Sequence, residues 1–333
     1  MEARDTRWWF AIFLITVSCL SVGARLPGSG QAQAGQKDLQ RLTVGYSPIS
    51  GATLPFFIAV EERLFQKHGL EVAPVFFGGS PLINVAILAG EFPIGISGGG
   101  AIISSRLGGT DLTAIGSLRS VLTIDAWAKP EIKSPAQLKG KSVAITRIGT
   151  STYFAGLSML DSFGLKRTDV VFIQAGGTGE SLAALMTGRV DVAMIAYPYD
   201  LTAKKAGFHL LFRPSETEYG LFPTTVIAAR ESWARDVKNR KVAIDFLRAL
   251  NEGLLLAREN ATVSKRALSK YTRVNDDAAL QSSFDFYKSA FSSTLRIVEK
   301  AMANALKFID HPKAKQADVK QFYDNSLVDE AMK

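Results

Sequence analysis

The sequence predicts an α/β protein built from two doubly wound sheets that are joined by two hinge strands. Strand-like and helical runs alternate up to about Trp233, and this alternation occurs twice. Such alternation predicts parallel sheets that helices cover on both faces. LTVGYS (42–47) and SVAITRIGTS (142–151) each lead through a turn of small residues into a helix. With 333 residues, 47% of them hydrophobic, the chain is long enough for two lobes with separate cores.

The first 34 residues have the features of a secretory signal peptide. Arg4 and Arg7 precede an apolar run (8–20), and small residues then lead to Ala32, Gln33 and Ala34, an A-x-A cleavage pattern. The apolar run is shorter than the roughly 20 residues of a transmembrane helix. We therefore expect export, cleavage near Ala34 and a periplasmic location.

Cys19 is the only cysteine, and it lies within this segment. Lipid anchoring at Cys19 is the weaker alternative, because Thr16 stands where a lipoprotein signal usually has Leu. Cleavage near Ala34 leaves no cysteine, which excludes a disulfide framework, a thiolate zinc site and a cysteine nucleophile. Cleavage also lowers the formal charge from +8 to +7, and the positive residues form no run typical of nucleic-acid binding. We expect no metal and no cofactor.

The internal repeat is visible in the glycines. The first helix of each repeat is predicted to end at a glycine that precedes a leucine: Gly69 in the first repeat and Gly164 in the second. A glycine at this place is expected of a left-handed helix C-cap. Later, FFGGSPLINVAILAGEFPIGIS and QAGGTGESLAALMTGRVDVAMI match at a spacing of 98 residues at Gly78 and Gly176, Ser80 and Thr178, and Gly90 and Gly188. The match could reflect common ancestry of the two repeats or the similarity that any two βαβ units show. The prediction of two α/β lobes needs only that the repeats share an architecture.

The repeat also suggests domain limits. We predict a signal peptide in residues 1–34, lobe 1 in residues 41–126 plus 228–333, and lobe 2 in residues 127–227. The stretches 121–132 and 222–233 are extended, β-branched and end in charged turns, as expected of paired hinge strands. From about Ala234 the apolar residues recur at helical spacing, so we expect this part to add helices to lobe 1.

Five turns should form a ligand cleft, because ligands of open α/β sheets bind at the carboxyl ends of the strands. These turns contain glycine and hydroxyl residues but no histidine, cysteine or carboxylate: 47–53, 78–80, 97–100, 150–152 and 176–178. They can hold a ligand without moving a proton. Helix capping is the alternative for each turn taken alone.

Several segments resemble one family. These segments are LTVGYSP, LPFFIAVEERLFQKHGLEV, GGSPLINVAILAGEFPIGISGG, GRVDVAMIAYPYDLTAKKAG and, above all, LKGKSVA (138–144) followed by a Gly-Thr-Ser turn. They resemble periplasmic substrate-binding proteins of ABC transporters in the nitrate, sulfonate and taurine group, which includes thiamine-pyrimidine-synthase-like members. The resemblance implies the type II periplasmic-binding-protein fold, closure on a small-molecule ligand and delivery to an inner-membrane ABC permease. We expect a monomer that binds no nucleic acid.

The resemblance also implies pocket positions. It points to Ser47 with its loop, to the turns at Ser80, Ser97 and Thr150, and to Tyr197, which replaces the acidic residue that many relatives have before the proline. We add two arginines, because a guanidinium suits a planar or tetrahedral anion. The candidate ligand-binding residues are Ser47, Ser50, Gly51, Gly79, Ser80, Ser97, Gly98, Arg119, Arg147, Thr150, Ser151 and Tyr197.

The predicted ligand is a small, anionic organic solute, sulfonate-like or carboxylate-like. Helix N-termini and the two arginines favour an anion, although each arginine could instead be a solvated surface residue. Tyrosines near the cleft favour an organic ligand over nitrate, although they could be interior packing: Tyr46, Tyr153, Tyr197 and Tyr199.

We do not expect an enzyme. The same fold hosts a dehydratase and a pyrimidine synthase, so fold alone does not decide. The three histidines are poorly placed for catalysis, Asp125 is interpreted as structural, and the cysteine-rich motif of the synthase is missing. A ligand-sensing exported domain is the third possibility.

Overall fold

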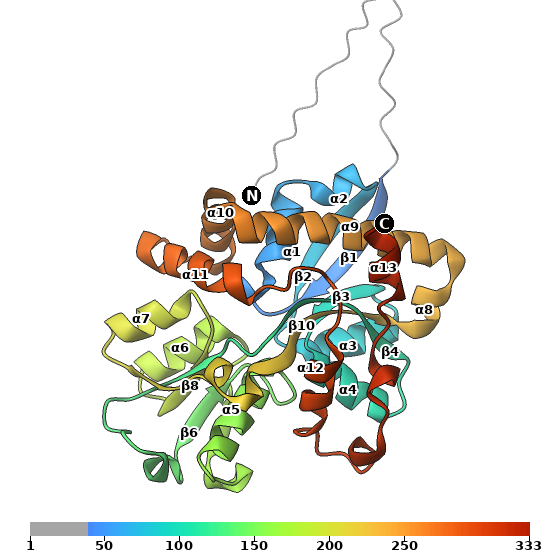
Figure 1. Cartoon of the computed structure of the whole chain (residues 1–333). Coiled ribbons are helices and arrows are strands. Elements are labelled where there is room, and N and C mark those ends of the chain that lie inside the picture. Colours follow the sequence, from blue (N-terminus) through green and yellow to red (C-terminus); the bar gives the residue numbers. More distant parts are fainter. Residues whose placement is uncertain (1–38) are drawn as a thin grey trace, which may run out of the picture. The chain divides into compact units, whose positions relative to one another are not determined.

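The structure is a computed structural model that describes residues 39–333 (Figure 1). The predicted signal peptide, Cys19 and the cleavage site at Ala34 lie outside the described residues. Within 39–333, no helix is both long enough and apolar enough to span a bilayer.

Two five-stranded sheets form the framework. The first sheet has the order β2-β1-β3-β10-β4 and the second has the order β7-β6-β8-β5-β9. We call each sheet with the helices packed on it the first and the second lobe. The strands of the first sheet are β1 (Gln40–Tyr46), β2 (Leu70–Phe76), β3 (Ile94–Ser97), β4 (Leu112–Val121) and β10 (Leu221–Arg230). Those of the second are β5 (Asp125–Ala128), β6 (Ser142–Ile145), β7 (Val171–Gln174), β8 (Val192–Ile195) and β9 (His209–Phe212).

The two sheets have equivalent topologies, which confirms the α/β fold with two doubly wound sheets. In each sheet one strand is antiparallel to both of its neighbours: β10 runs against β3 and β4, and β5 runs against β8 and β9. The alternation of strands and helices alone predicted parallel sheets, so this is a correction. Each reversed strand is the first strand after the chain crosses between the lobes, and this crossing changes its direction.

Helices cover both sheets, and the C-terminal part of the chain is helical as expected. The α-helices are α1 (Leu54–Glu61), α2 (Leu64–Lys67), α3 (Ser80–Ala89), α4 (Gly99–Leu107), α5 (Ser151–Ser162), α6 (Thr178–Met186), α7 (Tyr199–Lys205), α8 (Glu231–Arg235), α9 (Val237–Glu259), α10 (Ala261–Thr272), α11 (Asp277–Ala290), α12 (Glu299–Leu306) and α13 (Ser326–Ala331). Short 3₁₀ turns are η1 (Gly51–Thr53), η2 (Pro135–Leu138), η3 (Arg167–Asp169), η4 (Pro214–Glu216), η5 (Glu218–Gly220), η6 (Ala314–Gln316) and η7 (Val319–Phe322).

The glycine signals of the repeat are mostly confirmed. Gly69 and Gly164 have φ angles of 81° and 67°, the left-handed conformation expected of a C-cap. The first helix of repeat one is interrupted, however, because Arg63 is itself left-handed (φ 54°) and separates α1 from α2. In the glycine pairs that follow the second strand of each repeat, Gly176 has φ 94°, whereas in repeat one it is Gly79, not Gly78, that has positive φ. The backbone of the two turns is therefore offset by one residue.

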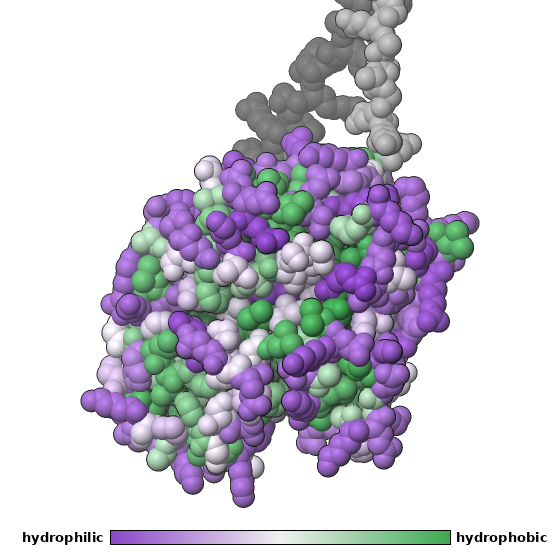
Figure 2. Space-filling view, in the orientation of Figure 1, coloured by the Kyte–Doolittle hydropathy of each residue, from purple (hydrophilic) through white to green (hydrophobic). Residues whose placement is uncertain are grey.

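The hydrophobic core does not divide into one core per lobe. One buried cluster lies in the first lobe, around Val44, Phe56 and Phe246, where α9 packs on α1 and α2. A smaller cluster, around Leu182, lies in the second lobe. Another cluster is continuous through both lobes and joins Ile102 to Phe154. The prediction of separate cores is therefore corrected in part: each lobe has a cluster of its own, and a shared cluster joins the lobes. In Figure 2, hydrophobic and neutral residues lie along the middle of the drawn face and hydrophilic residues surround them.

The chain crosses between the sheets after β4 and again before β10. The two crossings are bonded to each other, because Leu122 N donates to Gly220 O at 2.8 Å. Beside them, Thr224 Oγ1 of β10 donates to Val121 O at the end of β4 at 2.9 Å. The sequence assigned the second hinge to residues 222–233, but the structure places these residues largely in β10 of the first sheet. The return crossing therefore precedes them.

Candidate ligand-binding site

Two adjoining cavities lie between the lobes. The inner cavity has a volume of about 30 Å³ and the outer cavity has a volume of about 720 Å³. Both are lined by Ser47, Pro48, Thr146 and Thr178, so the two cavities meet at these residues. The inner cavity is lined by Ser47, Pro48, Ser50, Ala52, Ser80, Arg119, Ile124, Thr146, Thr150, Ser151, Thr152, Thr178, Ala196, Thr224 and Thr225.

The inner cavity lies where helices begin. Ser80, Ser151 and Thr178 are the first residues of α3, α5 and α6, so three helix N-termini converge on this cavity. Unpaired N–H groups and the helix dipole favour an anion at such a place. The strand-turn-helix order of the repeat produces this geometry, because the carboxyl ends of β1, β6 and neighbouring strands meet there.

Some hydroxyls of the inner cavity are already engaged. Ser50 Oγ accepts from Ala52 N at 3.2 Å, which is the capping role foreseen as the alternative. Ser151 Oγ donates to Thr224 O at 3.0 Å and thereby joins the lobes. Thr150 Oγ1 donates to the carbonyl of Arg147 at 2.6 Å. These residues shape the cavity wall as much as they offer contacts to a ligand.

Two threonine hydroxyls remain unpartnered. Thr146 and Thr178 are 3% and 2% exposed, and their Oγ1 atoms are buried without a hydrogen-bond partner among residues 39–333. Leaving a buried hydroxyl unpaired costs about 1 to 3 kcal/mol. Both threonines line both cavities, so a ligand at the junction can satisfy these hydroxyls.

Arg119 supplies the only cationic group among the residues that line the inner cavity. Its side chain is buried at 1% exposure, on β4, and its Nε donates to Thr224 Oγ1 at 2.9 Å. Its other nitrogens donate to Thr123 Oγ1 and, at 3.4 Å, to Thr225 Oγ1, and its Cζ lies 5.3 Å from the centre of the Tyr287 ring. No carboxylate in the described range forms an ion pair with it. Burial lowers the pKa of the Arg119 guanidinium.

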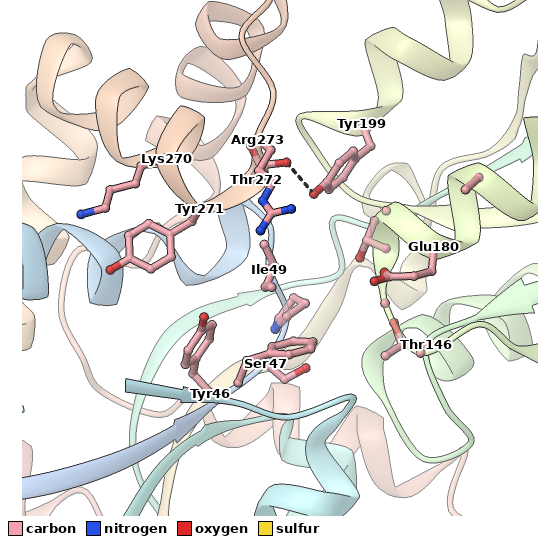
Figure 3. Close-up of a pocket in the computed structure, with 17 residues that line it drawn as sticks. Tyr46, Ser47, Ile49, Thr146, Glu180, Tyr199, Lys270, Tyr271, Thr272 and Arg273 are labelled. Atoms are coloured by element: carbon pink, nitrogen blue, oxygen red, sulfur yellow. Dashed lines mark hydrogen bonds between the residues drawn. The ribbon is translucent and has the colours of Figure 1, made fainter. Parts of the chain in front are cut away.

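The outer cavity is more aromatic (Figure 3). Tyr46 and Tyr271 lie on one side, and Thr146 and Glu180 lie on the opposite side. Tyr199 donates a hydrogen bond of 3.3 Å from its hydroxyl to Thr272 O, which connects α7 of the second lobe to the end of α10. The remaining lining residues are Ser47, Pro48, Ile49, Phe76, Gly176, Gly177, Thr178, Gly179, Ala183, Lys270 and Arg273.

Of the twelve predicted site residues, the inner cavity brings six together: Ser47, Ser50, Ser80, Arg119, Thr150 and Ser151. Gly79 and Gly98 instead lie at close contacts between the lobes. A Cβ at Gly98 would lie 3.2 Å from both Ser151 Oγ and Ser80 Oγ, and a Cβ at Gly79 would lie 3.0 Å from Thr150 Cγ2. These glycines let the lobes approach and do not line either cavity.

The other four predicted residues also lie outside the two linings. Arg147 is half-buried and its Nε donates to Gly78 O at 3.1 Å. The Tyr197 ring stacks on Phe286, with 3.9 Å between ring centres, and its carbonyl accepts from Gly51 N at 3.1 Å. Ser97 Oγ donates to the Asn84 side-chain oxygen at 2.9 Å.

The site list from the sequence lacked several lining residues. Thr178 and Thr146 stand in or beside turns that the sequence indicated, so their position after a strand was a usable signal. Thr224 and Thr225 lie in the stretch interpreted as a hinge. Tyr271 lies in the last turn of α10 and Arg273 directly follows that helix, far along the chain, and no local pattern distinguishes them.

Groups suited to acid-base or metal chemistry are scarce here. None of the residues that line the inner cavity is His, Cys, Asp or Glu, and within 39–333 no cluster of three or more such residues could hold a metal ion. Asp125 follows Ile124 of the lining but accepts a hydrogen bond from Arg213 Nε at 3.0 Å. Burial raises the pKa of Asp125 to about 6, although Arg213 opposes this.

Comparison with known proteins assigns the chain to a family. Residues 51–262 match the family described as NMT1/THI5 like, which is more than half of the chain. The chain belongs to this family. A protein of Brucella abortus (strain 2308), named as a candidate binding protein, is 27% identical to this NMT1/THI5 like chain over 255 residues, which cover 76% of the chain and 77% of the relative.

Solved structures share the fold of this NMT1/THI5 like protein. The periplasmic aliphatic sulphonate binding protein SsuA from Escherichia coli superposes with a TM-score of 0.66 at 21% identity, over 85% of this chain and 97% of that one. The periplasmic nitrate-binding protein NrtA from Synechocystis PCC 6803 gives a TM-score of 0.71 at 14% identity, over 88% of each chain. At such identities the likeness establishes the periplasmic binding protein fold.

Proposed function

We propose that the protein is the solute-binding component of an ABC importer and that it binds a small anionic organic solute between its two lobes. The observation that carries this proposal is the buried Arg119 guanidinium, whose hydrogen-bond partners in the described chain are threonine hydroxyls. A buried charge is costly unless an opposite charge accompanies it. An anionic ligand in the inner cavity supplies that charge.

Two further features support an anion. The N-termini of α3, α5 and α6 converge on the inner cavity, and each terminus favours a negative group by about 0.3 to 1 kcal/mol. The unpartnered hydroxyls of Thr146 and Thr178 can donate to carboxylate or sulfonate oxygens. The names of SsuA and NrtA specify anionic solutes for two proteins of the same fold.

The proposed mechanism is hinge closure. A ligand that touches Arg119 and Thr224 of the first lobe together with Thr146 and Thr178 of the second binds most tightly when the lobes are together. Its higher affinity for that arrangement shifts the population toward it. The closed form is then the one that a membrane permease recognises.

The proposal includes the absence of catalysis. An enzyme of this fold needs a positioned acid or base, and the inner cavity has none among its lining residues. A sensor that presents the same bound ligand to a receptor differs only in its partner. We also propose periplasmic export with cleavage near Ala34, which the mass of the exported protein checks.

The test is a binding series on the mature protein. Sulfonates, carboxylates and nitrate are compared with neutral and cationic analogues by thermal shift and calorimetry, and the ligand is recovered for analysis after incubation. A bound anion at 100 times its dissociation constant adds about 2.7 kcal/mol of stability, and it should be recovered unchanged. Arg119→Gln should weaken anion binding at least about tenfold, since hydrogen bonds to charged groups contribute about 1.5 to 3 kcal/mol.

The matched control is Arg41→Gln, because Arg41 is an exposed arginine of the same sheet and lines neither cavity. It should bind anions like the unmodified protein. Stabilisation by neutral or cationic compounds alone, or equal anion affinity in Arg119→Gln, contradicts the proposal. Conversion of the ligand during incubation contradicts the absence of catalysis.

A further inference from the structure

We propose that the outer cavity is a subsite for a flat, uncharged aromatic tail, so that the ligand is an aryl-bearing sulfonate or carboxylate. This inference rests on the proposed function and narrows its substrate class. It concerns how the two cavities divide one ligand between them: the anionic head group lies at Arg119 and the aromatic tail lies outside Thr146 and Thr178.

The volumes of the two cavities support this division. The inner cavity of about 30 Å³ has little more room than one or two water molecules need. The outer cavity of about 720 Å³ lies in the range of roughly 300 to 1,000 Å³ that holds drug-sized organic molecules. Because Thr146 and Thr178 line both cavities, a head group inside leads its tail directly into the outer cavity. An inorganic anion would leave the outer cavity without an occupant.

Part of the wall of the outer cavity consists of aromatic rings that pack on other aromatic rings of the protein. Tyr271 stacks on Phe57 with 3.9 Å between ring centres and an angle of 5°, and its hydroxyl donates to Glu61 Oε1 at 3.0 Å. Tyr46 lies with its ring centre 5.8 Å from that of Phe76. Since these rings are held by the protein itself, a flat tail meets surfaces that lose little freedom on binding.

Phe76 marks the surface that a tail would cover. It is 40% exposed although it is a large apolar side chain that lines the outer cavity. Burial of exposed apolar area is favourable roughly in proportion to the area removed from water. A tail that covers Phe76 therefore gains affinity from contact that a methyl-sized group cannot make.

The charges of the outer cavity favour an uncharged tail. Arg273 and Glu180 come from opposite lobes and have opposite signs, and Figure 3 shows them at separate places on the wall. Lys270 is already paired with Glu61 at 2.6 Å. The charges therefore offer no net preference for a charged tail, and the aromatic surfaces decide the selectivity.

The experiment compares tails on constant head groups. Calorimetry measures methanesulfonate against 2-naphthalenesulfonate and acetate against 2-naphthoate, with 2-naphthol as the compound that has the ring but no anionic head. We expect each naphthyl anion to bind at least tenfold more tightly than its methyl partner, and 2-naphthol to bind more weakly than either naphthyl anion. Phe76→Ala should remove most of the naphthyl advantage, and Tyr271→Leu provides a second variant that removes a ring of the same wall.

Val85→Ala is the matched control, because Val85 is 64% exposed and lines neither cavity. It should keep the full naphthyl advantage. If no anion binds, the proposed function itself fails. If methyl and naphthyl anions bind equally, or if both ring variants keep the naphthyl advantage, anion binding stands and the aromatic subsite is refuted.

Discussion

Arg147 Nε donates a hydrogen bond of 3.1 Å to Gly78 O, and this bond joins the turn after β6 in the second lobe to the turn after β2 in the first. The two residues are 69 positions apart in the chain. Arg147 was predicted to contact ligand, and its observed partner is instead the backbone of the opposite lobe. Its position suggests a role in holding the lobes together.

Arg147→Ala should therefore act on closure. The variant loses one interlobe hydrogen bond, worth about 0.5 to 1.5 kcal/mol, so the ligand-free protein should be more open and bind anions up to about tenfold more weakly. Small-angle scattering of the ligand-free protein and calorimetry measure these effects. Ile148→Ala, which alters an exposed apolar neighbour, is the control. A scattering profile and an affinity that both equal those of the unmodified protein would refute the role.

Gly100→Ala should separate the lobes by steric contact. A Cβ at Gly100 of α4 would lie 2.3 Å from Cε2 of Phe154 on α5, and that ring is itself held 5.2 Å from the Phe222 ring. Overpacking of this kind typically costs about 1 to 3 kcal/mol. We expect lower stability and weaker ligand binding, measured by denaturant unfolding and calorimetry. Adding Phe154→Leu removes the ring and should restore binding; a double variant as impaired as Gly100→Ala would show that the steric explanation is wrong.

Stability should rise as the pH falls from about 7 to 5. Burial raises the pKa of both Asp125 and Asp200 to about 6, against the opposing effect of Arg213 on Asp125 and of backbone N–H groups on Asp200. Because these pKa values lie above that of an unfolded aspartate, about 3.9, the folded protein binds the protons more tightly. Each group should add on the order of 1 kcal/mol to the free energy of unfolding at pH 5 relative to pH 7.

Denaturant titrations at pH 5, 6 and 7 measure this dependence. Asp125→Asn should remove about half of it, since the amide does not titrate and Asp200 remains. Lys205→Gln, which alters an exposed lysine, serves as the control and should keep the full dependence. A free energy of unfolding that increases from pH 5 to pH 7, or an unchanged slope in Asp125→Asn, would be the contrary result.

The sequence predicted well what is determined locally. Gly69 and Gly164 end helices in the left-handed conformation. This conformation depends on the glycine itself and on the helix before it, so no distant contact is needed to predict it. The order of strand, small turn and helix likewise placed Ser47, Ser80 and Thr150 at one cavity, since the carboxyl ends of the strands meet in any doubly wound sheet.

The sequence predicted less well what depends on distant contacts. Periodicity carries no information about strand direction, so the reversal of β5 and β10 was missed. Arg119 could be a surface or a buried residue, and only its packing against Thr224 and Tyr287, 105 and 168 positions away, distinguishes the two. Tyr271 reaches the outer cavity because α10 folds back over the first lobe, which no local pattern reveals.

The hydrogen bond between the two crossings, from Leu122 N to Gly220 O, limits how the lobes can move, and the bond from Thr224 Oγ1 to Val121 O ties β10 to β4 beside it. Two connecting segments that are hydrogen-bonded side by side should bend together, and they should resist twisting and sliding past each other. We therefore expect one lobe to swing about a single axis near these residues. Displacements should be smallest beside Val121 and should grow with distance from it, so probes at the rim of the lobes would report the motion most strongly.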